Sequence, residues 1–499
     1  MNSFGISSAV AFLVALLTIP LLLRLAARFG FSDAPGLRKL HKTEVPNIGG
    51  VALILSLLAG FATLLGLNPD LARQFLAESD LGLWVLVAVM VMFLMGFVDD
   101  HRGLRVRHKL LIQILVAVGL CAAGVRIDEI IVTGSVRAEF GWLSWPLTVL
   151  WIVGLTNAIN LIDGLDGLAA SLALVGCATL ALLGFVNGQP ILAGMSLAML
   201  GGLLGFLVFN FHPAKIFMGD GGSLSLGIFL AAGSVLSLQA KHSYPSFALP
   251  CLALGIPILD ATYCVVRRVL DRRSPFAPDR GHVHHRMLDL GLGQRKIVLL
   301  MLGVTLVSAG LGSTMLVYQR TARFIVFVAA ASVLFVFLWG VGYFQFRKTL
   351  NSLWEMHSMG RERRHAQRAF ETLQLQMREA ATFDEWWVVV CNAAQIWEFE
   401  SVEIEVKHRE GADEVLSWRA EAGAKDDLMA ATDRMHLSVP IAQRRPEQPL
   451  NVMVGIRTHG SLEGAASRFR LFARLIDEHG LANLVPNEGA SDGEPANTA

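Results

Sequence analysis

The feature that most constrains this chain is a series of long apolar runs between residues 6 and 345. A helix that crosses a bilayer needs about 20 mostly apolar residues. Runs of that kind lie at 6–28, 48–66, 81–98, 109–125, 145–162, 168–186, 190–211, 222–238, 246–266, 295–317 and 323–345. The chain is only 17% charged, whereas soluble domains carry about 25% charged residues. We therefore predict an all-α polytopic membrane protein with about eleven transmembrane helices and an additional C-terminal cytoplasmic α+β module.

The short loops between these runs predict how the helices cross. Lys and Arg accumulate in the cytoplasmic loops of membrane proteins. Alternate loops are rich in them: Arg38, Lys39, Lys42, Arg102, Arg105, Arg107, Lys109, Arg267, Arg268, Arg272, Arg273, Arg280 and Arg286. We expect this face to be cytoplasmic, with the N-terminus outside and the C-terminal third inside. The first run lacks a positively charged segment before it, so we interpret it as a retained helix rather than a signal peptide.

The last third of the chain has the pattern of a soluble module. Thr382 and Glu385 form a capping-box signature for a helix. Four alternating stretches then predict half-buried strands, SVEIEVKH, EVLSWRAEA, MHLSVPIA and NVMVGIRT, followed by a helix over SRFRLFARLIDEHGL. We divide the chain into a membrane domain at 1–346, this module at 347–485 and a disordered tail at 486–499. The order suits a sensor or interaction module, whose ligand or protein partner is unknown.

Aspartates gather at the cytoplasmic ends of the predicted spans. Asp99 and Asp100 end the third span, Asp163 and Asp166 separate the fifth from the sixth, and Asp220 opens the eighth, while Asp260 lies within the ninth. An ionised side chain at mid-bilayer costs about 2.5–3.5 kcal/mol on insertion scales. Adjacent carboxylates on one face therefore predict a hard divalent metal, Mg²⁺ with Mn²⁺ as the alternative. Aspartates that only meet interfacial water are the competing interpretation.

The segment NAINLIDGLDGLA is the most informative motif. Asn157, Asn160 and Asp163 recur every three residues, so they lie along one side of a helix. Gly164 and Gly167 then allow a tight turn and a close approach to a ligand. Two amides buried in an apolar helix would be costly for a purely structural turn.

The segment FNFHPAKIFMGDGGSLSLG combines Asn210, at the end of one span, with Asp220 in a glycine-rich turn that opens the next. Such a turn presents backbone N–H groups that suit phosphate or a metal-bound phosphate. Lys109 follows Asp99 in the turn back into the membrane. It is either a phosphate-neutralising cation or a positive-inside anchor.

The loop DRGHVHHRM contains His282, His284, His285 and Arg286. Arginine supplies forked donors and the histidines donate hydrogen bonds, so we favour phosphate recognition over a zinc site. A solvated basic loop is the competing interpretation. The five cysteines show no CxxC spacing, which gives no support to a disulfide framework.

These motifs, in this order, resemble the polyprenyl-phosphate N-acetylhexosamine-1-phosphate transferase family over residues 1–346. The GHVHHR segment looks like the branch that uses UDP-N-acetylglucosamine. The resemblance implies a bundle of ten or eleven helices in the bacterial inner (plasma) membrane, with its active site at the cytoplasmic face. It implies transfer of N-acetylglucosamine-1-phosphate to undecaprenyl or another polyprenyl phosphate with release of UMP, as the first membrane step of cell-surface polysaccharide synthesis.

The resemblance also assigns roles to individual residues. Asp220 and Asn160 are the implied Mg²⁺ ligands, with Asp100 nearby. Asp99, Asp100, Asp163 and Lys109 form the implied catalytic group, and the implied substrate-binding set is Asn157, Asp166, Asn210, His282, His284, His285 and Arg286. We favour one-step transfer over a covalent aspartyl intermediate. We expect no nucleic-acid partner, and we consider a homodimer as the assembly.

Two other functions compete with this enzyme. A transporter or ion channel also carries intramembrane acids, but such acids usually lie near the midplane between repeated halves, and no repeat is evident here. An inactive scaffold is disfavoured because the motif residues are all present.

Overall fold

The computed structural model describes the chain at residues 2–29, 45–77, 81–133, 136–239, 244–271, 274, 281–318, 321–342, 368–406, 414–420, 434–441, 450–457 and 462–478. The chain divides into two compact units, Met1–Phe346 and Arg347–Ala499. The predicted tail at 486–499 and the loop cations Arg38, Lys39, Lys42, Arg272, Arg273 and Arg280 lie outside the described residues.

The first unit is a helical bundle, as predicted. Its long helices are α1 (Asn2–Phe29), α2 (Gly49–Leu67), α4 (Leu81–Arg102), α5 (Val106–Ala123), α6 (Ser144–Ile162), α7 (Leu168–Asn187), α8 (Pro190–Asn210), α9 (Gly219–Gln239), α13 (Gln294–Ser313) and α14 (Thr321–Gly340). Within the described residues, ten helical segments are long and apolar enough to cross a membrane, and a bent pair raises the number to eleven. The prediction of a polytopic membrane protein is confirmed.

The bent pair consists of α10 (Tyr244–Ala253) and α11 (Gly255–Leu270), which meet at an angle of 75°. The length of the apolar run at 246–266 predicted a single span here. The smaller elements α3 (Pro69–Ala77), α12 (Val283–Asp289), the 3₁₀ turns η1 (Gly141–Leu143) and η2 (Thr314–Leu316), and the antiparallel hairpin β1 (Glu129–Thr133) and β2 (Val136–Glu139) were not predicted.

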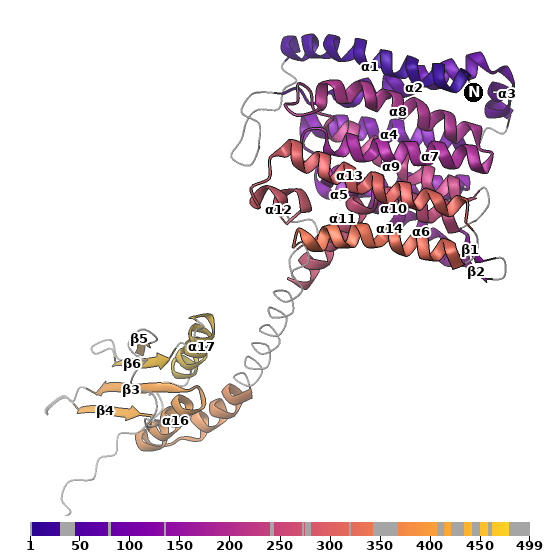
Figure 1. Cartoon of the computed structure of the whole chain (residues 1–499). Coiled ribbons are helices and arrows are strands. Elements are labelled where there is room, and N and C mark those ends of the chain that lie inside the picture. Colours follow the sequence, from indigo (N-terminus) through magenta and orange to yellow (C-terminus); the bar gives the residue numbers. More distant parts are fainter. Residues whose placement is uncertain are drawn as a thin grey trace, which may run out of the picture. The chain divides into compact units, whose positions relative to one another are not determined.

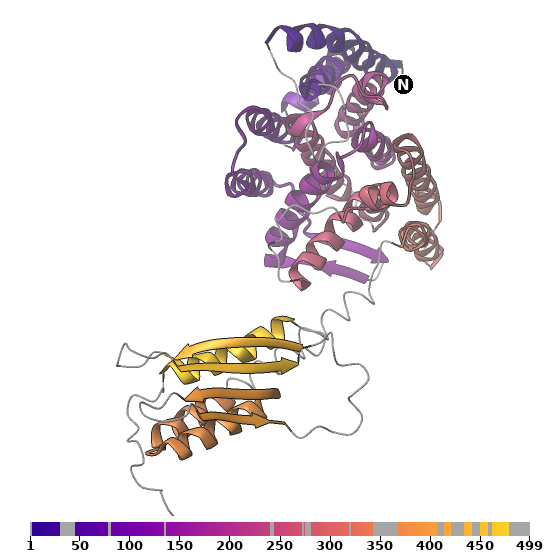
Figure 2. The same cartoon turned by 90° about the vertical axis from the view of Figure 1, so that its left-hand side faces the viewer.

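Helix α9 is the centre of the bundle. Its membrane-spanning stretch is entirely buried, and it packs against α4, α6, α2 and α7. Helices α1, α2 and α8 pack together on one side, at the top of Figure 1, and the helices are seen from another side in Figure 2. Small residues allow the close packing: a Cβ added at Gly227 would lie 2.8 Å from the Thr156 backbone. The first turn of α9, which carries Asp220, therefore lies among the ends of neighbouring helices.

The second unit has a four-stranded antiparallel sheet in the order β4-β3-β6-β5. Its strands are β3 (Phe399–Val406), β4 (Glu414–Arg419), β5 (Arg434–Ile441) and β6 (Leu450–Arg457), at the four predicted places. Helix α16 (Phe383–Ile396) begins at the predicted capping box of Thr382 and Glu385, and α17 (Leu462–Glu478) follows the last strand. Both helices, together with the helical residues 368–379, share one apolar core with Val402, Ile404 and Val454 of the sheet.

Candidate active site

Asp220 is the focus of a cluster of side chains from three helices. It stands in the first turn of α9, where Lys109 Nζ from α5 lies 3.1 Å from its Oδ2 atom. The amide nitrogen of Asn160, from the end of α6, donates to Asp220 Oδ1 at 2.9 Å and to Ser223 Oγ at 2.9 Å. Helix ends that are far apart in the sequence therefore present oxygen and nitrogen atoms to one carboxylate.

The adjacent aspartates at the end of α4 complete this cluster. Asp100 accepts the backbone N–H groups of Asp220 at 2.9 Å and of Gly221 at 3.1 Å, so its carboxylate caps the start of α9. Asp99 is buried, accepts the backbone N–H of Leu104 at 2.7 Å, and forms an ion pair with Lys109. The cluster thus contains three carboxylates and one ammonium group, which pairs with Asp99 and Asp220, and its formal charge is −3 + 1 = −2 when all are ionised.

Glycines allow the backbones around this cluster to approach closely. A Cβ at Gly96 of α4 would lie 2.4 Å from the Asp220 carbonyl oxygen. The start of α2 also supports the turn, because Gly49 and Gly50 donate backbone hydrogen bonds to the carbonyls of Phe217 and Met218, both at 2.9 Å. Sequence reasoning missed these supports. The glycine pair Gly49–Gly50 at the start of a span was the available signal.

The turn between α6 and α7 brings two further aspartates to the same end of the bundle. No side-chain hydrogen bond joins the Asp163 carboxyl to the described residues, and its pKa is raised to about 7 by desolvation and then by the negative charges of Asp220, Asp100 and Asp166. Asp166 instead supports the loop after α8: its Oδ2 atom is 2.7 Å from His212 Nδ1 and accepts the Ala214 N–H at 3.1 Å.

The histidine segment lies beside this turn. A Cβ at Gly164 would be 2.5 Å from His284 Nε2, so the His284 ring contacts the residue after Asp163. The ring of His284 lies 5.8 Å from that of His282 and 4.4 Å from that of His285, measured between centroids. Burial lowers the pKa of His284 to about 3, which keeps this imidazole neutral.

The remaining predicted residues form other contacts. Asn157 pairs with Gln113, with amide-to-oxygen distances of 2.6 and 3.3 Å. The buried Asn210 side chain donates to the Ile216 carbonyl at 2.8 Å, which supports the loop before α9. Arg286 Nε donates to the Val341 carbonyl at 3.0 Å, at the end of α14. The structure thus brings Asp99, Asp100, Lys109, Asn160 and Asp220 together. The catalytic, metal-binding and substrate-binding roles of all the predicted site residues stay predictions.

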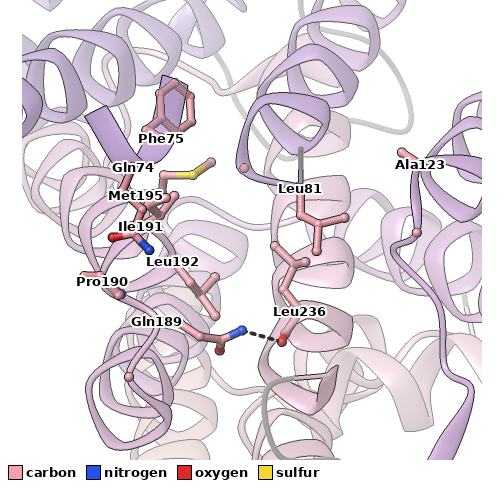
Figure 3. A pocket seen from close by; sticks show the side chains of 13 residues that line it. Gln74, Phe75, Leu81, Ala123, Gln189, Pro190, Ile191, Leu192, Met195 and Leu236 are labelled. Atoms are coloured by element: carbon pink, nitrogen blue, oxygen red, sulfur yellow. Dashed lines mark hydrogen bonds between the residues drawn. The ribbon is translucent and has the colours of Figure 1, made fainter. Parts of the chain in front are cut away.

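A cavity of about 470 Å³ lies at the other ends of these helices. It is lined by Leu81 at the start of α4, Ala123 at the end of α5, Gln189 before α8 and Leu236 near the end of α9 (Figure 3). The aspartates stand at the opposite ends of α4 and α9. This cavity is therefore separate from the carboxylate cluster.

Comparison with known proteins identifies the membrane unit. The model of glycosyl transferase family 4 matches residues 83–238. A relative from Bacillus subtilis (strain 168), named "Probable undecaprenyl-phosphate N-acetylglucosaminyl 1-phosphate transferase", is 41% identical over 295 residues, which cover 58% of this chain and 80% of the relative. The chain belongs to glycosyl transferase family 4.

Other relatives in this family have related names. The decaprenyl-phosphate N-acetylglucosaminephosphotransferase of Mycobacterium tuberculosis (strain CDC 1551 / Oshkosh) is 36% identical over 320 residues, covering 59% of this chain and 78% of the relative. The phospho-N-acetylmuramoyl-pentapeptide-transferase of Desulforudis audaxviator (strain MP104C) is 33% identical over 335 residues, covering 62% of this chain and 96% of the relative. The family match spans Asp99, Lys109, Asn160 and Asp220, so the central cluster lies in the family region.

Proposed function

We propose that this glycosyl transferase family 4 protein transfers N-acetylglucosamine-1-phosphate from UDP-N-acetylglucosamine to undecaprenyl or another polyprenyl phosphate, releasing UMP. The observation that carries the proposal is the cluster of Asp99, Asp100, Lys109, Asn160 and Asp220 at one end of a membrane bundle. Relatives named as sugar-phosphate transferases acting on undecaprenyl and decaprenyl phosphate support the same reaction class. The names of the relatives described above give no support to the transporter alternative.

The chemistry of the cluster fits a divalent cation. Its donors are carboxylate and amide oxygens, which Mg²⁺ prefers, and its net negative charge requires compensation. Asp220 and Asn160 would hold Mg²⁺, with Asp100 adjacent and Mn²⁺ as the alternative ion. Asn160 now presents its amide nitrogen to Asp220, and a half-turn of the amide brings its carbonyl oxygen to the same place. When bound, the ion would neutralise the charge of the diphosphate.

The protein groups then act mainly by position and charge, as is general for phosphoryl transfer. Lys109 lies where it can neutralise an incoming acceptor phosphate beside Asp99. That phosphate is mostly dianionic at neutral pH because its second pKa is about 6, so Asp99 orients it or acts as a modest base. Asp163, which has no side-chain partner in the described chain, faces the nucleotide side together with the histidine segment.

The proposal extends to location and organisation. We place the protein in a bacterial plasma membrane with the cluster and the C-terminal module on the cytoplasmic side, because the basic loops accumulate on the face of the cluster. Nucleotide sugars are made in the cytoplasm, which agrees with that orientation. The membrane domain at 1–346 would carry the reaction, the module at 347–485 would serve as a sensor or interaction module, and the protein would assemble as a homodimer.

A UMP-release assay tests the reaction. Purified full-length protein in detergent or nanodiscs is mixed with UDP-N-acetylglucosamine, polyprenyl phosphate and Mg²⁺, and UMP is measured by chromatography. We expect UMP only when donor, acceptor and divalent cation are all present, and at least 100-fold less with Asp220→Asn. Magnesium-independent UMP release, or full activity of Asp220→Asn, would show that the cluster is not the reaction site.

A further inference from the structure

Asp260 is a buried aspartate of the membrane unit that the proposed reaction leaves without a role. It is 1% exposed and lies in the second turn of α11, the helix that follows the 75° bend. Helix α11 packs against α6, the helix that carries Asn160. A buried carboxylate in an apolar helix is costly unless it is paired, so its partners indicate what it does.

Both oxygens of Asp260 bind the start of the histidine segment. Oδ2 lies 2.8 Å from His282 Nδ1, and Oδ1 accepts the Val283 backbone N–H at 2.9 Å. Val283 and Met287 are fully buried beside this contact, which fixes α12 on the bundle. The carboxylate therefore sets both the position of the segment and the orientation of the His282 ring.

The same contact determines the proton on His282. With Nδ1–H donated to Asp260, the atom left to meet a ligand is Nε2, which has no partner among the described residues. Burial lowers the pKa of His282, but the hydrogen bond and charge of Asp260 outweigh it and raise the pKa to about 10. At neutral pH His282 is therefore a cation with an N–H at Nε2.

His282 also connects Asp260 to the turn that holds Asp163. Its ring stacks on His284 at 5.8 Å with an interplanar angle of 12°, and His284 contacts Gly164. The Nδ1 atom of His284 is buried without a hydrogen-bond partner. The atom of His284 next to Gly164 is Nε2, so a ligand is expected at the two ring nitrogens that lack a partner in the described chain, His282 Nε2 and His284 Nδ1.

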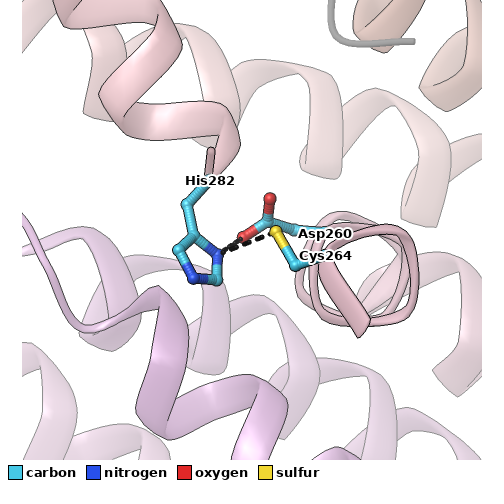
Figure 4. A group of neighbouring side chains, drawn as sticks. All are labelled: Asp260, Cys264 and His282. Atoms are coloured by element: carbon cyan, nitrogen blue, oxygen red, sulfur yellow. Dashed lines mark hydrogen bonds and ion pairs between the residues drawn. The ribbon is translucent and has the colours of Figure 1, made fainter. Parts of the chain in front are cut away.

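We propose that Asp260 is a positioning residue, which holds His282 as an oriented cationic donor toward the diphosphate of the nucleotide sugar. This inference rests on the proposed function. The alternative is a metal ion, since donor atoms of Asp260, Cys264 and His282 lie within 4.8 Å of one another (Figure 4). The 2.8 Å contact is a hydrogen-bond length, and Arg267 Nη2 lies 3.9 Å from Cys264 Sγ, where its charge would repel a cation.

A double-mutant cycle tests whether Asp260 acts through His282. Asp260→Asn keeps the shape and can still accept the Val283 N–H, but its amide donates to Nδ1 and leaves His282 neutral. We expect kcat for UMP release to fall by about 100-fold. In a His282→Gln background the same change should cost less than about twofold, because residues that act as a unit are non-additive. If the activity losses of Asp260→Asn and His282→Gln instead multiply in the double variant, the proposal is wrong.

Cys264→Ser is the matched control. It should keep activity within about twofold, and elemental analysis should find no stoichiometric zinc or iron in the full-length protein. One equivalent of metal that is lost in Cys264→Ser would show that the cluster is a metal site and that the positioning role is wrong.

Hydrogen exchange gives a readout that does not depend on the reaction. Peptides over residues 281–290 should exchange faster in Asp260→Asn than in wild type or Cys264→Ser. Unchanged exchange together with unchanged kcat contradicts the proposal. If wild type releases no UMP while exchange changes as expected, the proposed function fails but the Asp260 contact stands.

If Asp260→Asn does not fold, Asp260→Glu, which keeps the charge, should retain at least tenfold more activity than His282→Gln. Equal activity of the two variants would contradict the proposal.

Discussion

Replacing Lys109 with methionine separates charge neutralisation from metal binding. The ammonium group lies 3.1 Å from Asp220 Oδ2, with side-chain exposures of 28% and 33%. At an effective dielectric constant of about 20, two unit charges at that distance interact by about 5 kcal/mol. Desolvation and screening reduce the net value to the 1.5–3 kcal/mol, roughly, of a charged hydrogen bond. A cation that binds Asp220 must overcome this competition.

We therefore expect opposite effects on two measured quantities. In Lys109→Met the Mg²⁺ concentration for half-maximal rate should fall by about tenfold, because a competing cation is gone. The maximal rate should fall by about 100-fold or more, because the acceptor phosphate loses a neutralising donor. Magnesium titrations of UMP release measure both, with Asp220→Asn as the control, which should raise the Mg²⁺ requirement. A Lys109→Met protein that needs more Mg²⁺, or keeps its maximal rate, would refute this reasoning.

Three further predictions concern packing, pH and stereochemistry. Gly96→Ala should destabilise the protein by about 1–3 kcal/mol and impair UMP release, because its Cβ would collide with the Asp220 backbone, whereas Gly119→Ala, which meets nothing within 4 Å, should leave the melting temperature and the rate nearly unchanged. The raised pKa of Asp163 keeps its carboxyl protonated below about pH 7, so the rate of UMP release should rise with pH through that value. More Mg²⁺ should move the midpoint of this rise to lower pH. A rate that is flat from pH 5 to 8 would contradict a role for ionised Asp163. One-step transfer should invert the configuration at the transferred phosphorus of a chiral thiophosphate donor, and retention would instead support a covalent intermediate.

The sequence was most informative where the structure depends on local patterns of residues. Span length predicted the membrane helices, and the Thr382–Glu385 pair predicted the start of α16. The glycine turn correctly placed Asp220 in the first turn of a helix. Each of these features follows from residues within a few positions of one another, so a single sequence is enough to detect it.

The contacts that the sequence did not predict join distant segments. Asp100 caps a helix that begins 119 residues later at Gly219, since 219 − 100 = 119. Asp260, in the helix that follows the bend, meets His282, which lies 22 residues further along the chain. Neither contact has a local signature, because an aspartate in an apolar run looks the same whatever lies across from it. The fold is needed to divide the aspartates into those that bind backbone groups and those left for substrate.

The most direct test of the function follows the phosphorus between the nucleotide and the sugar. UDP-N-acetylglucosamine carrying ³²P in its β-phosphate is incubated with the purified protein, polyprenyl phosphate and Mg²⁺, and the lipid is extracted. Sugar-1-phosphate transfer predicts that the label enters the lipid in a 1:1 ratio with unlabelled UMP in the aqueous phase. Label that remains in water-soluble UDP, with only the sugar reaching the lipid, would contradict phosphoryl transfer by the aspartate cluster.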